Sequence, residues 1–168
     1  FAGWRLVPAG LLLLGIARLR GRSLAIRFDQ YRIVATVGLF LLVGGMYFTF
    51  LAEQSIPSGL AALIVALLPL WVALAESIVP GMERPSGRGY LGLVIGFAGL
   101  GVRSAPRLSG ISGTPAEMAG IGLQILGTWF WTTGSILSKR KPVQVDSMVA
   151  TGYEMLTAGF VLLVIGTL

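Results

Sequence analysis

Glu154 stands out among the ionisable residues of this 168-residue chain because it interrupts a long apolar run. It lies seven residues beyond Ser147, which is roughly 10 Å along a helix. Ser147, Thr151 and Ala158 share its face at helical spacing. A charge deep in an apolar layer costs about 2.5 to 3.5 kcal/mol, so such a group usually faces a cavity or a partner. We expect Glu154 to handle substrate or protons; a structural hydrogen bond between helices is the alternative.

Arg5 and Glu53 are two further charged candidates for the same pathway. Arg5 also lies in an apolar run, and the alternative for it is a side chain that snorkels to the membrane surface. Glu53 and Gln54 end a second apolar run, where an interfacial position is the default. Glu53 is nevertheless a pathway candidate, because the turn from Ser55 to Ser58 that follows it is too short to leave the membrane surface.

A helix around residue 130 has one polar and aromatic face. This face contains Gln124, Thr128, Trp131, Ser135 and Ser138. We expect the face to look inward, with Gln124 and Trp131 on the substrate pathway and Trp131 as a cavity wall. Packing between helices is the alternative for most of the aromatic cluster.

Cysteine and histidine are both absent from the chain. Their absence excludes thiolate nucleophiles, disulfides, Ser-His-Asp triads and nearly every zinc, haem or copper site. We therefore expect no catalytic residue, no metal and no cofactor, and we interpret the chain as something other than an enzyme.

The composition points to a lipid environment for all these groups. Hydrophobic residues make up 55% of the chain and charged residues only 12%, against about 25% charged in ordinary globular domains. Apolar runs long enough to cross a bilayer can be counted directly. Six are expected, at residues 4–17 (which we expect to be incomplete), 33–52, 58–79, 89–102, 118–138 and 147–168. The predicted fold class is all-α, a polytopic transmembrane helical bundle.

The basic residues test this segmentation independently. Ten of the thirteen Lys and Arg residues fall in the alternate loops 18–32, 80–88 and 139–146. Cytoplasmic loops carry such an excess, so these loops are expected on the inner side. The same distribution argues against a nucleic-acid surface. The expected partners are the lipid bilayer and a small-molecule substrate, with no nucleic acid.

Glycine and proline mark expected packing and bending positions. Gly89, Gly92, Gly96 and Gly99 alternate steps of three and four residues, which predicts a groove for helix packing. Pro69 lies inside the third expected span and predicts a kink there, because proline removes a backbone hydrogen bond.

Two segments resemble each other at an offset of 149 residues. Residues 4–13 (WRLVPAGLLL) align with residues 153–162 (YEMLTAGFVL). Each segment begins with an aromatic residue and a charged residue, and each has Ala-Gly at its sixth and seventh positions. They are five spans apart and so enter the membrane from opposite faces, which is typical of an inverted-topology repeat. The alternative is a chance match between two apolar helices. Arg5 aligns with Glu154, and an ion pair between them across the pseudo-twofold axis is possible.

The stretch from Ala52 to Ile64 (AEQSIPSGLAALI), then Pro69, Glu83-Arg84 and the glycine-rich helix from Gly89, resembles the EamA-domain drug/metabolite transporter superfamily. Residues 153–159 (YEMLTAG) resemble its bacterial inner-membrane exporter branch. The resemblance implies a ten-helix carrier of two inverted five-helix repeats. Because the chain starts at Phe1 and ends inside an apolar run, we interpret it as a fragment with helices two to seven. Residues 1–112 would be a partial first repeat and residues 113–168 the start of the second.

The expected function is transport of small metabolites or drug-like solutes by alternating access, in a multi-pass protein of the inner cell membrane. Two alternatives stay open at this point. One is an integral-membrane enzyme that uses carboxylates at the interface, and the other is a scaffold or channel subunit that carries no solute itself.

Overall fold

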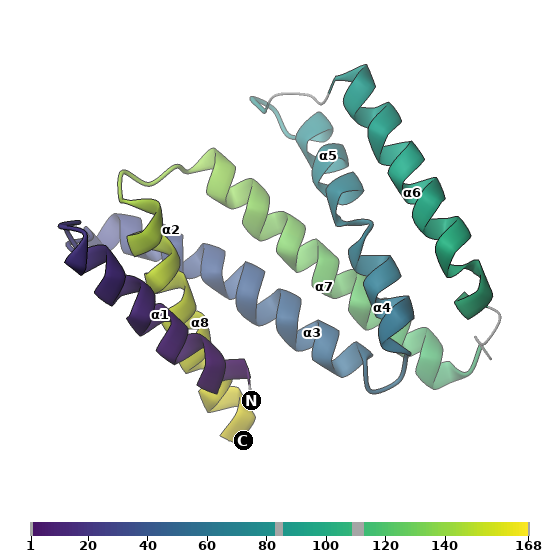
Figure 1. Cartoon of the computed structure of the whole chain (residues 1–168), viewed down its shortest axis with the longest axis horizontal. Helices are drawn as coiled ribbons and strands as arrows, with labels where there is room; N and C mark the ends of the chain where they lie inside the picture. The colour runs from purple at the N-terminus through teal and green to yellow at the C-terminus, as the bar shows by residue number, and fades with distance from the viewer. Residues whose placement is uncertain (1, 83–85, 109–112, 168) are drawn as a thin grey trace. The chain divides into compact units, whose positions relative to one another are not determined.

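The computed structural model describes residues 2–82, 86–108 and 113–167, and the regular structure in this part of the chain is entirely helical (Figure 1). This confirms the all-α fold class. Glu83 and Arg84, the end of the last predicted span at Leu168 and the predicted repeat boundary at residue 112 lie outside the described residues. The elements are α1 (Ala2–Leu19), α2 (Phe28–Gly38), the π-helix η1 (Leu39–Gly44), α3 (Gly45–Ala52), α4 (Ser58–Val65), α5 (Leu68–Ile78), α6 (Gly87–Leu108), α7 (Pro115–Arg140) and α8 (Ser147–Thr167).

Four helical stretches of the described chain are long and apolar enough to cross a membrane. They are Ala2–Leu19, Phe28–Ala52, Ser58–Ile78 and Ser147–Gly166. The other two predicted spans are also helical, as α6 and α7, and α6 is longer than the predicted range of 89–102. The chain is therefore a polytopic membrane protein built from helices.

Local sequence signals explain where the helices begin and end. Thr114 and Glu117 form a capping box at the start of α7, with N–H to side-chain oxygen distances of 3.2 and 3.3 Å, and Pro115 takes the first helical position. Asp146 caps α8, since its Oδ1 accepts from the Met148 N–H at 3.0 Å. Gly21, with a φ of 74°, ends α1 in a left-handed turn that an L side chain would strain.

The helices form two compact units. The first contains the residues up to Gly44 together with those from Thr133 onward, and the second is Gly45–Thr132. In the first unit α1 and α8 lie side by side and antiparallel (Figure 1), since Gly3 lies next to Gly159 and Gly10 next to Gly152. These units do not follow the predicted division at residue 112, which stays a prediction.

The second unit has a small apolar core at the ends of α3 and α4. Ala52, Ile56, Ala61 and Ile64 are buried there, with Leu60, Ile121, Leu123 and Ile125 packed against them. α6 packs against α4 and α5 (Figure 1). Gly120 lies against this core, because a Cβ on it would come within 2.9 Å of the Ile56 side chain.

The third predicted span is interrupted. Its helix stops at Val65 and resumes at Leu68, and Pro69 lies in the first turn of α5. A proline ring clashes with the carbonyl four residues earlier, which here belongs to Val65. The backbone hydrogen bond from Leu67 N–H to Ile64 instead spans only three residues, at 3.1 Å. The chain thus changes direction just before the proline.

Three of the four groove glycines of α6 face open space in the described structure. A Cβ at Gly92, Gly96 or Gly99 would meet nothing within 4 Å. α6 therefore contacts α4 and α5 without using these three positions, and helix packing at the groove, including Gly89, stays a prediction.

Candidate functional site: a cavity beside Glu154

A cavity of about 320 Å³ lies in the first unit between α2, the end of α7 and the start of α8. One wall is apolar and contains Val34, Val37 and Leu41. The rest of the lining is mixed: Ser138, Lys141, Ser147, Thr151 and Glu154 are polar, while Ile33, Pro142, Val143, Val145 and Ala150 are not. The cavity thus combines hydroxyl groups and two charges with apolar side chains, which suits a small solute that has both polar and apolar parts.

Glu154 contributes a half-buried carboxyl group to this cavity, from inside the span Ser147–Gly166. Ser147 and Thr151 line the cavity with it, as their spacing predicted, whereas Ala158 is fully buried elsewhere on α8. On the side of α2, a Cβ at Gly38 would lie 3.0 Å from both the Cα and the carbonyl oxygen of Glu154. The backbone of α2 therefore lies directly against Glu154.

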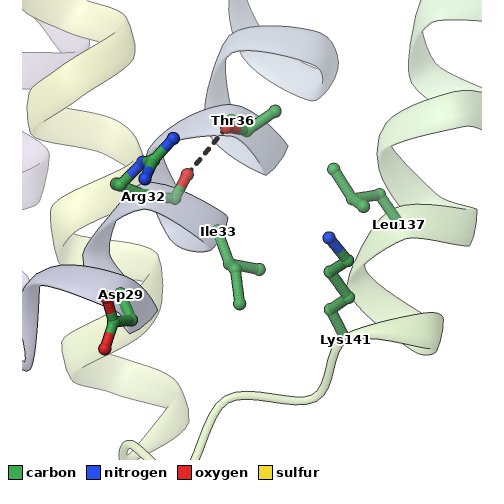
Figure 2. Close-up of a pocket in the computed structure, with 6 residues that line it drawn as sticks. All are labelled: Asp29, Arg32, Ile33, Thr36, Leu137 and Lys141. Atoms are coloured by element: carbon green, nitrogen blue, oxygen red, sulfur yellow. Dashed lines mark hydrogen bonds between the residues drawn. The ribbon is translucent and has the colours of Figure 1, made fainter.

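A second cavity, of about 380 Å³, adjoins the first. It is lined by Asp29, Arg32, Ile33, Thr36, Leu137 and Lys141 (Figure 2). Ile33 and Lys141 line both cavities. Figure 2 shows the Lys141 ammonium group directed into the space between the end of α7 and α2. The two cavities thus meet at Lys141, at the helix ends that the basic-residue pattern assigns to the inner side.

The carboxylates near these cavities other than Glu154 form ion pairs with arginines and not with Lys141. Asp29 pairs with Arg27 at 3.7 Å, and Asp146 pairs with Arg22 at 3.3 Å. Of the described residues that line the 320 Å³ cavity, only Lys141 and Glu154 carry a charge, and neither side chain has an ion-pair partner in the described part of the chain. The cavity therefore offers one cation and one carboxyl group to a solute.

Two tyrosines hold α8 in place next to the site. The hydroxyl groups of Tyr31 and Thr157 are 3.2 Å apart, and the Tyr153 hydroxyl donates to the carbonyl of Leu24 at 3.1 Å. The two tyrosine rings meet edge to face, with centroids 5.9 Å apart. These contacts tie α2 and the segment before it to α8 on either side of Glu154.

The structure does not form the possible ion pair between Arg5 and Glu154. Arg5 is exposed on α1, and the ion pairs in the described part of the chain are formed by Arg22 and Arg27. The reason is helical geometry. Gly152 and Gly159 face α1, while Glu154 lies on the face of α8 against Gly38. Arg5 as a pathway residue stays a prediction, without the ion pair.

The other predicted pathway residues lie in the second unit. Gln124 is 0% exposed, and its Nε2 donates to the Thr49 hydroxyl at 3.1 Å, whereas its Oε1 is buried without a hydrogen-bond partner in the described structure. Trp131 is 38% exposed, with its ring against Gly45. Glu53 is exposed just beyond α3. Their place on a pathway stays a prediction.

Two residues of the site were not singled out by sequence reasoning. Lys141 was counted only as one of the basic residues of an inner loop, and Gly38 sits unmarked within an apolar run. The spacing of the polar residues Ser138 and Lys141 at the end of α7 is the signal that could have indicated Lys141. Gly38 had no such signal, because its importance depends on which helix packs against it.

In the described part of the chain, no group of three or more Asp, Glu, His or Cys side chains is placed to hold a metal ion. The polar groups that line the cavity beside Glu154 are hydroxyl groups, one amine and one carboxyl group.

Comparison with known proteins assigns the family. The model of the EamA-like transporter family matches residues 1–104. The inner membrane transporter YedA of Escherichia coli K12, itself named as uncharacterized, is 35% identical over 164 residues, which cover 97% of this chain and 51% of YedA. The uncharacterized transporter sll0355 of Synechocystis is 31% identical, over 96% of this chain and 52% of its own length.

A solved crystal structure shares the fold. It has a TM-score of 0.75 and 25% sequence identity, over 96% of this chain and 55% of that chain. The chain thus spans about half the length of the relatives it matches. The helical membrane architecture, the family match over residues 1–104 and the similarity to named transporters agree, and the chain belongs to the EamA-like transporter family.

Proposed function

We propose that this chain forms part of an inner-membrane carrier that exports small metabolites or drug-like solutes by alternating access, with Glu154 on the solute or proton path. The observation that carries the proposal is the 320 Å³ cavity with a half-buried carboxyl group inside a membrane-spanning helix. Intramembrane carboxyl groups are rare and typically serve substrate or proton pathways. The volume falls at the small end of ligand pockets, which hold about 300 to 1,000 Å³.

The arrangement of the site supports access from the inner side. Lys141 and the adjoining cavity lie at the helix ends that the basic loops place in the cytoplasm, and Glu154 lies further along α8. A solute that enters from the cytoplasm would meet the amine first and the carboxyl group second. Export then requires the path to close behind the solute and open outward, which inverted repeats achieve by rocking around a shared site.

The two-repeat organisation belongs to the same proposal. We place a partial first repeat at residues 1–112 and the start of the second at residues 113–168. The reciprocal glycine contacts between α1 and α8 support this division, because they join the two segments that resemble each other at an offset of 149 residues. The relatives that this chain half covers are named as transporters, which supports transport rather than an enzymatic role.

Transport is tested with the complete carrier in proteoliposomes. A panel of radiolabelled amino acids, sugars and quaternary ammonium compounds is offered in counterflow, and a carrier accumulates at least one of them against preloaded unlabelled solute. Failure of every compound, with folded protein in the bilayer, would favour a scaffold. A channel would let label equilibrate without overshoot.

The role of Glu154 is tested with Glu154→Gln. If this carboxyl group exchanges protons during transport, the variant loses the pH-dependence of the rate. Glu117→Gln is the matched control, because Glu117 lines neither cavity and a glutamine keeps its capping interaction with Thr114 at the start of α7. Transport by Glu154→Gln with an unchanged pH profile would contradict the assignment of Glu154 while leaving transport itself intact.

A further inference from the structure

We propose that Gly38 is a positioning residue for Glu154: its lack of a side chain lets the α2 backbone rest on the backbone of Glu154 and so fixes where the carboxyl group enters the cavity. The inference rests on the proposed role of Glu154 in transport. It adds a second residue to the site, on a different helix, which acts through Glu154 and not by touching the solute.

The contact is specific to Glu154. The three atoms nearest to a Cβ on Gly38 would be the Cα, the carbonyl oxygen and the Cβ of Glu154, at 3.0, 3.0 and 3.1 Å. Two of them are backbone atoms, which cannot swing aside as the end of a flexible side chain can. Any side chain at position 38 must therefore move α2 or the segment of α8 that carries Glu154.

The neighbourhood of Gly38 makes such a movement reach the cavity. Val37, next to Gly38, and Val34 are buried and line the cavity. The π-helix η1 starts at Leu39, and π-turns inside α-helices are frequent at functional sites. Leu41 within it lines the same cavity. A shift at Gly38 thus changes the wall and the carboxyl group together.

Several charged or titratable groups surround Glu154, and the test has to separate their effects. Lys141 lines the same cavity after α7, while Asp29 and Arg32 on α2 line the adjoining one. Tyr31 on α2 and Tyr153 on α8 contact each other. On α1, Arg5 is exposed. The three atoms nearest to a Cβ on Gly38 all belong to Glu154 and none to these groups, so a substitution at Gly38 displaces Glu154 first.

The test compares Gly38→Ala with Gly3→Ala in the complete carrier. Gly3 is an equally crowded glycine of the same unit, but a Cβ there would meet the Leu163 side chain at 2.7 Å and the Gly159 carbonyl oxygen at 2.8 Å, and neither residue lines the cavity. Both variants perturb packing. The local readout is the labelling rate of Glu154 by dicyclohexylcarbodiimide, measured by mass spectrometry, and the functional readout is the pH profile of counterflow.

We expect Gly38→Ala to change the labelling rate of Glu154 by about threefold. Misplacing a reacting group by 1 Å can lower a reaction rate roughly hundredfold, and a displacement of the carboxyl group by a few tenths of an ångström should have a correspondingly smaller effect. It should also displace the pH profile. Gly3→Ala should leave both unchanged even if it lowers the yield of folded carrier. Equal effects of the two variants, or an unchanged labelling rate in Gly38→Ala, would overturn the proposal.

The labelling readout needs no solute, so it separates this inference from the proposed function. If Glu154→Gln keeps a normal pH profile while Gly38→Ala still alters labelling of Glu154, the contact positions the carboxyl group but transport does not use it, and the positioning role in transport fails. If Gly38→Ala does not fold, Val37→Ala with the same two readouts replaces it, because it loosens α2 next to Gly38 without adding an atom there.

Discussion

Gly10 and Gly152 lie backbone against backbone, since a Cβ on Gly10 would come within 2.9 Å of the Gly152 carbonyl oxygen. Gly3 and Gly159 repeat the contact, with a Cβ on Gly3 at 2.8 Å from the Gly159 carbonyl oxygen. An offset of 149 residues turns Gly3 into Gly152 and Gly10 into Gly159, so the two contacts exchange. Reciprocity of this kind is the property of a twofold-related interface.

We expect Gly10→Ala to destabilise the carrier because α1 and α8 would have to separate at a backbone contact. Overpacking of this kind costs about 1 to 3 kcal/mol. Thermal unfolding in detergent, followed by tryptophan fluorescence, measures the change. Gly15→Ala on the same helix is the control: a Cβ there meets nothing within 4 Å, and alanine favours the helix, so its unfolding temperature should stay equal or rise. Equal losses in both variants would contradict the close contact.

The offset of 149 residues relates the two segments that form this contact, although the sequence did not predict that α1 and α8 pack against each other. The expected spans depend on local apolarity, and the described helices are long and apolar enough to cross a membrane at four of the six. The missing Arg5–Glu154 ion pair shows where such reasoning ends. The alignment related the two positions, but the direction of each side chain depends on which face of α8 packs on α1, and Gly152 and Gly159 take that face.

The candidate site was only half predictable for a related reason. Glu154, Ser147 and Thr151 share one helix face, and a periodicity reveals such a face. Lys141 and Gly38 join the site from other segments, through tertiary contacts that no local pattern records. The fully buried Gln124 was likewise expected on a polar inner face, but its direct partner Thr49 is 75 residues away in sequence.

Lys141 should favour solutes with a negative group, because it is the only cation that lines the cavity of Glu154 among the described residues. We expect Lys141→Gln to raise the KM for a transported carboxylate about fivefold, corresponding to roughly 1 kcal/mol for a solvent-accessible charge pair. The KM for its methyl ester should not change. Lys141→Arg should retain the preference, and Arg18→Gln, an exposed site with the same charge change, should retain it too. Equal KM increases for acid and ester would show a packing effect instead.

Asp146 both caps α8 and pairs with Arg22, and the cap should dominate its contribution to stability. Asparagine is as good a cap as aspartate, while an exposed ion pair contributes little. We therefore expect Asp146→Asn to unfold near the parent temperature and Asp146→Ala to lose about 1 kcal/mol. Arg22→Gln should resemble Asp146→Asn. A large loss in Asp146→Asn would assign the stability to the ion pair.

Gln124 and Thr49 form a buried pair whose members should respond in opposite ways to substitution. The Gln124 Oε1 has no partner in the described structure, so Gln124→Leu removes an unsatisfied group along with the bond to Thr49. We expect its unfolding temperature to stay equal or rise. Thr49→Val instead leaves the whole buried amide of Gln124 without a partner, which costs about 1 to 3 kcal/mol.

The double variant Thr49→Val with Gln124→Leu decides between a structural and a transport role for Gln124. Because it removes both polar partners, its stability should recover to that of Gln124→Leu. Hydrogen bonds between membrane helices average only about 0.6 kcal/mol, so the expected recovery is of that size. If the Gln124 amide also binds solute, counterflow falls in both variants that lack it despite their stable fold. Full transport by a stable Gln124→Leu carrier would remove Gln124 from the pathway and leave the Glu154 cavity as its only supported part.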